Sequence, residues 1–200
     1  MPRGFHAPPH AFEEFEITME YTAQDVKKLR DETGAGFADC KSALTEAGSY
    51  KEALTILDQK GAKRAEKVKA QERETRQGQV TSYIHHGGNL GVLLELNCST
   101  DFVANSDEFR ALARDLAMQI AGANPSYVAR AEVSEDMLAQ LREEAGGDAQ
   151  LEKKLAEVVL LEQPWIKDPK VTIGQLVDGV IRKTGENVVI RRFARFALGE

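Results

Sequence analysis

Residues 78–98, GQVTSYIHHGGNLGVLLELNC, decide the fold because apolar and polar side chains alternate in them on both sides of a turn. The alternating positions are Val80, Ser82, Ile84, Val92, Leu94 and Leu96. A period of two is typical of a β-strand, and the glycines of His86-Gly87-Gly88-Asn89 suit a tight connection between two strands. The stretch therefore predicts a β-hairpin.

Helical spacing replaces this alternation after the hairpin, in segments that begin near residues 105, 134, 151 and 172. Asn105 and Glu108 predict the cap of the first segment, and Thr172 opens a capping box for the last. Alternation returns in residues 188–198, which predicts a final strand. We expect an α+β domain over residues 78–200, in the order β-β-α-α-α-β, with an antiparallel sheet and covering helices on one face.

Three short helices are predicted on the other side of the hairpin, within residues 20–61. Thr22 and Ser49 each begin a capping box, at the starts of the first and third helices. Glycine closes helices readily because it adopts the left-handed conformation, so the helices are expected to end at Gly34, Gly48 and Gly61. Three helices with short turns predict a small bundle.

Two further segments lack a buried face. Residues 1–19 contain prolines and histidines without periodicity, so we expect a poorly ordered extension. Residues 62–77 are dominated by charges of both signs, and we interpret them as a solvated helical linker. A phosphate-binding stripe is the functional alternative, but interleaved aromatic side chains are missing there.

Composition narrows the class of protein. The 200 residues carry a formal net charge of -6, which argues against a general nucleic-acid binder and favours a protein partner. The chain has neither a long uncharged run for a membrane span nor a secretory start, so we expect a cytoplasmic protein. Cys40 and Cys98 are too few for a disulfide scaffold and resemble reduced, small hydrophobic residues.

Common catalytic signatures are absent from the sequence: it has no phosphate-binding glycine motif, zinc-binding histidine pair or nucleophile-elbow serine. His85 and His86 lie beside the turn without further ligands at metal-site spacing, so no metal and no cofactor is expected. One enzymatic alternative remains, a cysteine hydrolase with Cys98 as nucleophile, His85 as base and Asp101 as orienting group.

Three stretches, in order along the chain, resemble one family. Residues 29–44 (LRDETGAGFADCKSAL) are similar to the N-terminal domain of elongation factor Ts, and residues 100–109 (TDFVANSDEF) to its central signature. Residues 162–168 (EQPWIKD) and 185–192 (GENVVIRR) resemble the C-terminal half of its short members. The resemblance extends over almost everything from residue 20 to residue 200.

The resemblance implies a non-enzymatic factor that binds elongation factor Tu in its GDP-bound and nucleotide-free states and promotes GDP release. It implies a ubiquitin-associated-like three-helix domain in residues 20–61 and an α+β core that grips the partner. Family members act by deforming the magnesium and phosphate sites of the partner's nucleotide domain. No bond chemistry is involved.

The same resemblance implies which residues touch the partner. Phe102 takes the position of a wedge between two helices of the partner, with Thr100, Asp101 and Val103 beside it, although packing within its own domain is the alternative for Phe102 and the more natural role for Val103. Asp101 is expected to cap the turn or to face the partner. Three residues of the N-terminal domain take docking positions: Arg30, Phe37 and Ala38.

The sequence departs from the family at two points. Many members have two methionines where this chain has Phe37-Ala38, which implies a stiffer and smaller contact. Longer members carry two core repeats and this chain has one, so we expect a homodimer through an exposed sheet edge or face, with Cys98 possible at that interface. Gly34 and Gly36 are both expected to adopt left-handed conformations at the docking turn.

A competing hypothesis is a ubiquitin-associated-type protein-binding module joined to a structural dimerisation domain, without exchange activity. It accounts for the helical bundle but leaves residues 100–103 without a role.

Overall fold

The computed structural model describes residues 21–71 and 74–200, so the extension expected over residues 1–19 lies outside the described residues. The described chain forms two compact units, one ending at Asp58 and the next beginning at Gln59. Within the described residues, no helix is both long and apolar enough to cross a lipid bilayer.

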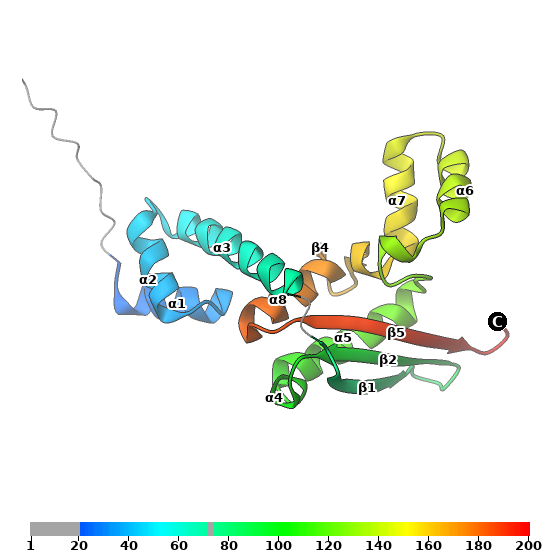
Figure 1. Ribbon diagram of the computed structural model, residues 1–200, viewed down its shortest axis with the longest axis horizontal. Helices are drawn as coiled ribbons and strands as arrows, with labels where there is room; N and C mark the ends of the chain where they lie inside the picture. Colours follow the sequence, from blue (N-terminus) through cyan, green and yellow to red (C-terminus); the bar gives the residue numbers. More distant parts are fainter. Residues whose placement is uncertain (1–20, 72–73) are drawn as a thin grey trace, which may run out of the picture. The chain divides into compact units, whose positions relative to one another are not determined.

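The first unit contains helices α1 (Ala23–Thr33) and α2 (Phe37–Glu46) and the start of α3 (Tyr50–Ala70) (Figure 1). Its capping box forms as expected, since Thr22 Oγ1 accepts from the Asp25 N–H and the Asp25 carboxylate accepts from the Thr22 N–H. Small and aliphatic side chains make a core of its own, among them Leu29, Cys40 and Leu44.

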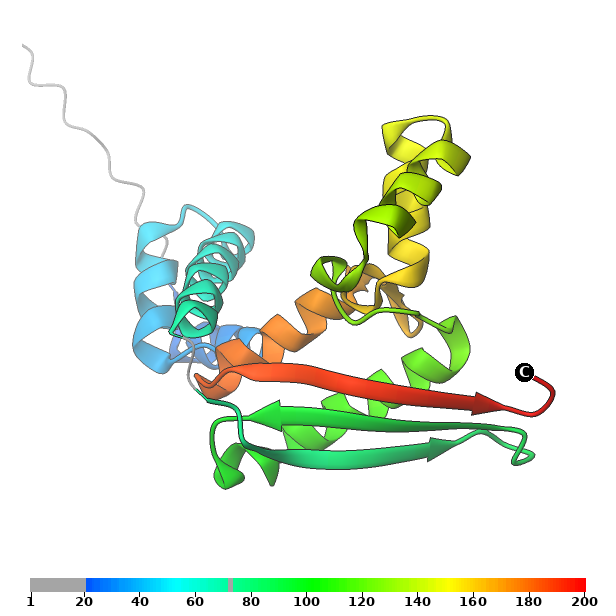
Figure 2. The ribbon, with the colours of Figure 1, turned by 45° about the vertical axis from the view of Figure 1, so that its right-hand side comes forward.

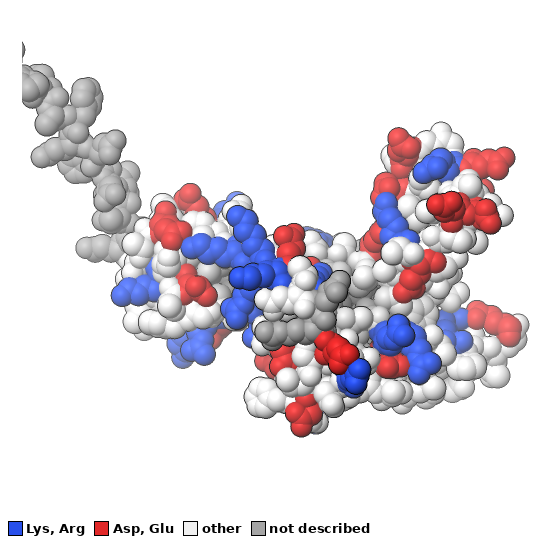
Figure 3. Space-filling view, viewed as in Figure 1, with Lys and Arg blue, Asp and Glu red and all other residues white. Residues whose placement is uncertain are grey.

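Helix α3 corrects the expected end at Gly61, because it continues through that glycine to Ala70. A glycine within a helix costs only about 1 kcal/mol, and here it leaves room for a neighbour. A Cβ at Gly61 would lie 2.6 Å from Arg182 Cδ. The segment interpreted as solvated is also partly packed: Ala65 is buried in the core of the second unit. The lysines and arginines among its described residues are exposed, and Figure 3 shows such side chains gathered over α3.

The second unit is built on a three-stranded antiparallel sheet of order β1-β2-β5. Strands β1 (Gln77–Ile84) and β2 (Leu90–Cys98) form the predicted hairpin, and β5 (Val188–Ala197) pairs with β2. Helices α5 (Asp107–Ala123) and α8 (Ile173–Thr184) cover one face, and in Figure 2 the sheet lies in front of them. This is the α+β fold expected from the sequence.

The segment between β2 and β5 contains more helices and strands than the expected three helices. The described residues there hold five α-helices, two 3₁₀ helices and a short two-stranded ribbon that the sequence did not reveal. The elements not yet given are α4 (Asp101–Ala104), η1 (Arg130–Glu132), α6 (Glu135–Ala145), α7 (Asp148–Val158), η2 (Leu160–Glu162), β3 (Pro164–Trp165) and β4 (Asp168–Thr172). Helices α6 and α7 enclose a separate small cluster that includes Val133, Leu151 and Leu155.

The buried face of two strands differs from what their alternation indicates. On β1, Gln79, Thr81 and Tyr83 are half-buried towards the helices, whereas Val80 and Ile84 are exposed on the open face. On β5, a bulge pairs Leu96 with Ile190 but Glu95 with Arg192, so one extra residue shifts the alternation. Residues after the bulge therefore change face, and Phe196 joins the open side.

Candidate partner-binding site

The four residues expected near the wedge lie together on the single helical turn α4 and its N-cap. Thr100 is the N-cap, and its Oγ1 accepts a hydrogen bond from the Val103 N–H at 3.3 Å. Asp101 is the first helical residue and is exposed, so the cap of this turn is Thr100 and not Asp101. The expected cap of α5 also moves by one residue, from Asn105 to Ser106, because Asn105 closes α4 instead.

Phe102 points away from the protein, with 82% of its surface exposed. Val103, the next residue, is only 3% exposed and belongs to the core beneath the sheet. One turn of helix therefore presents a large aromatic side chain outward and fixes itself inward through the valine. Because its side chain is buried, Val103 supports the turn and offers no surface to a partner.

Hydrogen bonds hold α4 at both ends. At its C-terminal end, Gln79 Nε2 of β1 donates to the Ala104 carbonyl at 2.7 Å, and the Asn105 side chain donates to the Asp101 carbonyl at 2.9 Å. At its N-terminal end, the Glu186 carboxylate accepts from Thr100. A four-residue helix is not stable by itself, so these contacts explain why it keeps its shape.

The docking residues of the N-terminal unit flank the turn between α1 and α2. Arg30, Phe37 and Ala38 are all exposed, and Phe37 retains 57% of its accessible surface. Gly34 ends α1 in the left-handed conformation, with φ of 67°. Gly36 does not share it: its φ is -63° in extended backbone, so only one of the two glycines has the expected left-handed conformation.

The residues of the hydrolase alternative are not brought together. The His85 N–H donates a hydrogen bond to the carbonyl of Leu90, so His85 lies beside the start of β2. Cys98 lies at the other end of that nine-residue strand, roughly 26 Å away at about 3.3 Å per residue. Cys98 is fully buried on the helix side, and burial raises the pKa of its thiol. This excludes Cys98 from the open sheet face and from hydrolase chemistry with His85.

The described residues contain no cluster of three or more histidine, cysteine or acidic side chains suited to a metal ion. Phe102, an exposed aromatic side chain on an anchored turn of the second unit, is the kind of feature through which proteins bind other proteins. The fold that carries this turn defines the chain as an α+β protein.

Comparison with known proteins identifies the family of this chain. The family model described as Elongation factor TS matches residues 13–200. The chain is 48% identical to the Elongation factor Ts of Carboxydothermus hydrogenoformans, over 90% of this chain and 89% of that protein. It is 45% identical to that of Coprothermobacter proteolyticus, over 91% of this chain and 100% of the relative. The chain belongs to the elongation factor Ts family, whose role is in translation elongation.

Proposed function

We propose that this protein is a guanine-nucleotide exchange factor that binds elongation factor Tu carrying GDP and promotes GDP release. The observation that supports this most directly is Phe102, an apolar side chain held in water on a turn that is anchored at both ends. Such a side chain can occupy an apolar slot that opens only when two helices of the partner separate. As a translation factor, the protein would act in the cytoplasm.

The proposed mechanism is coupling without bond chemistry. The factor binds the nucleotide-free partner more tightly than the GDP-bound partner. Phe102 and Asp101 contact the partner near the partner's magnesium and phosphate sites. By linkage, GDP weakens the binding of the factor by the same ratio. Residues 20–61 form the proposed docking domain, in which Arg30, Phe37 and Ala38 supply affinity for the partner.

The decisive experiment follows the release of labelled GDP from elongation factor Tu, with this protein present in catalytic amounts. We expect release to accelerate many-fold, because one factor molecule can serve many partner molecules. An unchanged release rate at a saturating concentration of the factor would refute the proposal. Arg30→Ala and Phe37→Ala serve as docking variants, and they should raise the concentration needed for half-maximal acceleration more than they lower the maximal rate.

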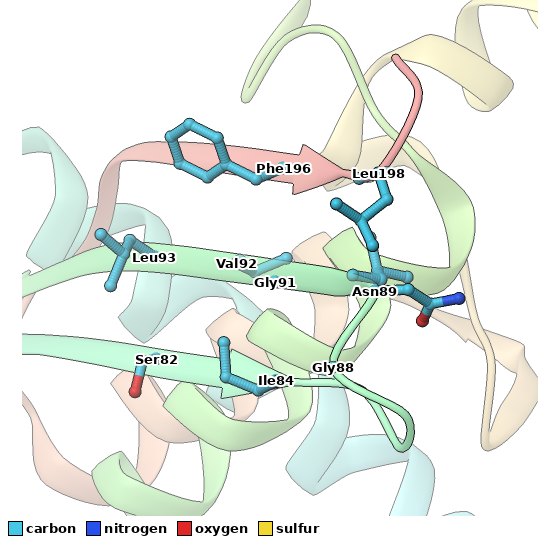
Figure 4. Close-up of a pocket in the computed structure, with 11 residues that line it drawn as sticks. Ser82, Ile84, Gly88, Asn89, Gly91, Val92, Leu93, Phe196 and Leu198 are labelled. Atoms are coloured by element: carbon cyan, nitrogen blue, oxygen red, sulfur yellow. The ribbon is translucent and has the colours of Figure 1, made fainter.

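We also propose a homodimer through the open face of the sheet. Five apolar side chains there are exposed, and we call them the open-face patch: Val80, Ile84, Leu93, Phe196 and Leu198. Figure 4 shows part of this patch around a hollow of about 550 Å³, where Gly91 leaves space between Ile84 and Phe196 on the neighbouring strands. In a two-fold dimer the same patch of both copies meets, so these exposed apolar side chains can be buried against a second copy.

A further inference from the structure

Glu186 lies between α8 and β5 and grips the start of the Phe102 turn. Its carboxylate accepts two hydrogen bonds from Thr100, one from the backbone N–H at 3.0 Å and one from the hydroxyl at 2.7 Å. The two residues are 86 positions apart in the sequence. A bidentate contact of this kind fixes both the backbone and the side-chain rotamer of Thr100.

The sheet register explains how Glu186 comes to this place. The pairing of β2 with β5 ends with Asn97 opposite Val189 and Cys98 opposite Val188. Continued by two residues, the same register sets Thr100 opposite Glu186. The backbone of Glu186 is itself held, since Gly185 closes α8 with φ of 72° and the Glu186 N–H donates to Thr184 Oγ1 at 3.3 Å.

The contact bears directly on Phe102. The hydroxyl of Thr100 donates to Glu186, while the oxygen of that hydroxyl accepts from the Val103 N–H and so caps α4. Glu186 therefore selects the rotamer in which the cap is made. Without it the hydroxyl can turn to water, the one-turn helix loses its N-terminal anchor, and Phe102 samples other directions.

We propose that Glu186 is a positioning residue for Phe102: it keeps the aromatic side chain in the orientation that enters the partner, without touching the partner itself. This inference rests on the proposed exchange function. A pre-oriented side chain loses less conformational freedom when the partner opens, so Glu186 acts on the maximal rate of GDP release. Docking through the N-terminal unit does not depend on it.

The first experiment measures the rate of GDP release from elongation factor Tu across factor concentrations for the wild type, Glu186→Ala and Glu186→Gln. Charge-assisted hydrogen bonds to one group predict about a tenfold lower maximal rate for Glu186→Ala, with little change in the half-saturating concentration. Glu186→Gln keeps the shape and one acceptor oxygen, so a smaller loss is expected. Glu132→Ala is the matched control, because that carboxylate also accepts a backbone N–H, from Val128 at 2.9 Å, away from α4.

A double-mutant cycle with Phe102→Ala tests the route of the effect. If Glu186 acts through Phe102, Glu186→Ala should change the rate by less than about twofold in the Phe102→Ala background. A full tenfold further loss there would overturn the proposal, as would a maximal rate for Glu186→Ala equal to that of the Glu132→Ala control. Melting temperatures of all variants separate these effects from loss of folded protein.

A measurement on the factor alone distinguishes this inference from the exchange function. Hydrogen exchange at the Thr100 amide should accelerate in Glu186→Ala and not in Glu132→Ala, because Glu186 accepts that N–H. An unchanged rate of hydrogen exchange at the Thr100 amide would show that Glu186 does not anchor the turn. If the wild type failed to accelerate GDP release from elongation factor Tu, the nucleotide-exchange function would be rejected, and the role of Glu186 in it as well. Faster hydrogen exchange at the Thr100 amide in Glu186→Ala would still establish the anchor.

Discussion

Phe102 and Phe109 are seven residues apart and lie in opposite environments: the first is 82% exposed and the second is 0% exposed. Helical spacing identifies Phe109 as a core residue, because it shares a face with Leu112 and Leu116. Spacing cannot place Phe102, which belongs to a single turn too short to have a period. The sequence therefore predicts the core helix from its pattern, whereas the exposure of Phe102 required the structure.

Phe102→Ala separates partner binding from folding. The side chain buries little surface in its own domain, so we expect the melting temperature to change by no more than a degree or two. A hot-spot aromatic residue contributes about 2 kcal/mol or more, which corresponds to roughly a thirtyfold lower rate of GDP release. One thermal melt and one release trace on the same variant check both. A normal rate with a large drop in melting temperature would show that Phe102 packs internally.

Cys98 is expected to be unreactive in the native protein. Its thiol is buried, its Sγ lies 3.1 Å from the Thr100 carbonyl oxygen, and burial is the main cause that raises its pKa. Since the thiolate is the reactive form, a thiol reagent at neutral pH should modify Cys98 only after unfolding, and a rise in pH should increase the rate only above the ordinary thiol range. Rapid modification of the folded protein would contradict this, with the urea-unfolded chain as the positive control.

At the scale of elements, capping chemistry predicted helix starts well and glycine predicted helix ends less well. Thr22, Ser134 and Thr172 all cap helices as their side chains indicate. Gly61 does not end α3, because packing of the helix against the second unit's core outweighs a small propensity cost. The bulge of β5 has no local sequence signal either, since it is set by pairing with β2.

Gly78 is an element-scale test of why the hairpin needs its glycines. Its φ is 150°, and a Cβ there would lie 2.2 Å from the backbone carbonyl oxygen of Leu96 on β2. Gly78→Ala must therefore shift one strand, at a cost of about 3 kcal/mol. Gly88→Ala is the control: its φ is also positive, at 72°, but a Cβ there has nothing within 4 Å, so about 1 kcal/mol is expected. Urea unfolding measures both, and equal losses would exclude the close approach as the cause.

At the scale of the whole molecule, the second unit covers one face of its sheet and leaves the other apolar. Helices α5 and α8 cover the first face, on which Val92, Leu94 and Leu96 are buried. No described helix of this unit contributes to the lining of the hollow on the second face, where the open-face patch lies. The sequence predicted one sheet with helices on one face, but which apolar residues remain outside follows from the burial of β1 and the bulge of β5.

The proposed dimer therefore makes a specific prediction about Phe196. This side chain is 67% exposed on β5, opposite Gly91 of β2, so its replacement costs the monomer little. In a two-fold dimer every substitution acts twice, because each copy contributes the same patch. Phe196→Glu places two carboxylates in an apolar interface and should weaken association at least thirtyfold, an effect of about 2 kcal/mol.

Sedimentation at micromolar concentration measures this, with Ile166→Glu as the matched control. Ile166 is also an exposed aliphatic residue, next to β3 and outside the open-face patch, so the same charge there should leave the dimer intact. Dissociation caused by both variants would indicate a general loss of solubility or structure and not a defined interface. The wild type could also sediment only as a monomer and still accelerate GDP release from elongation factor Tu at the full rate. That result would show that one copy of the core suffices and that the open-face patch serves another purpose.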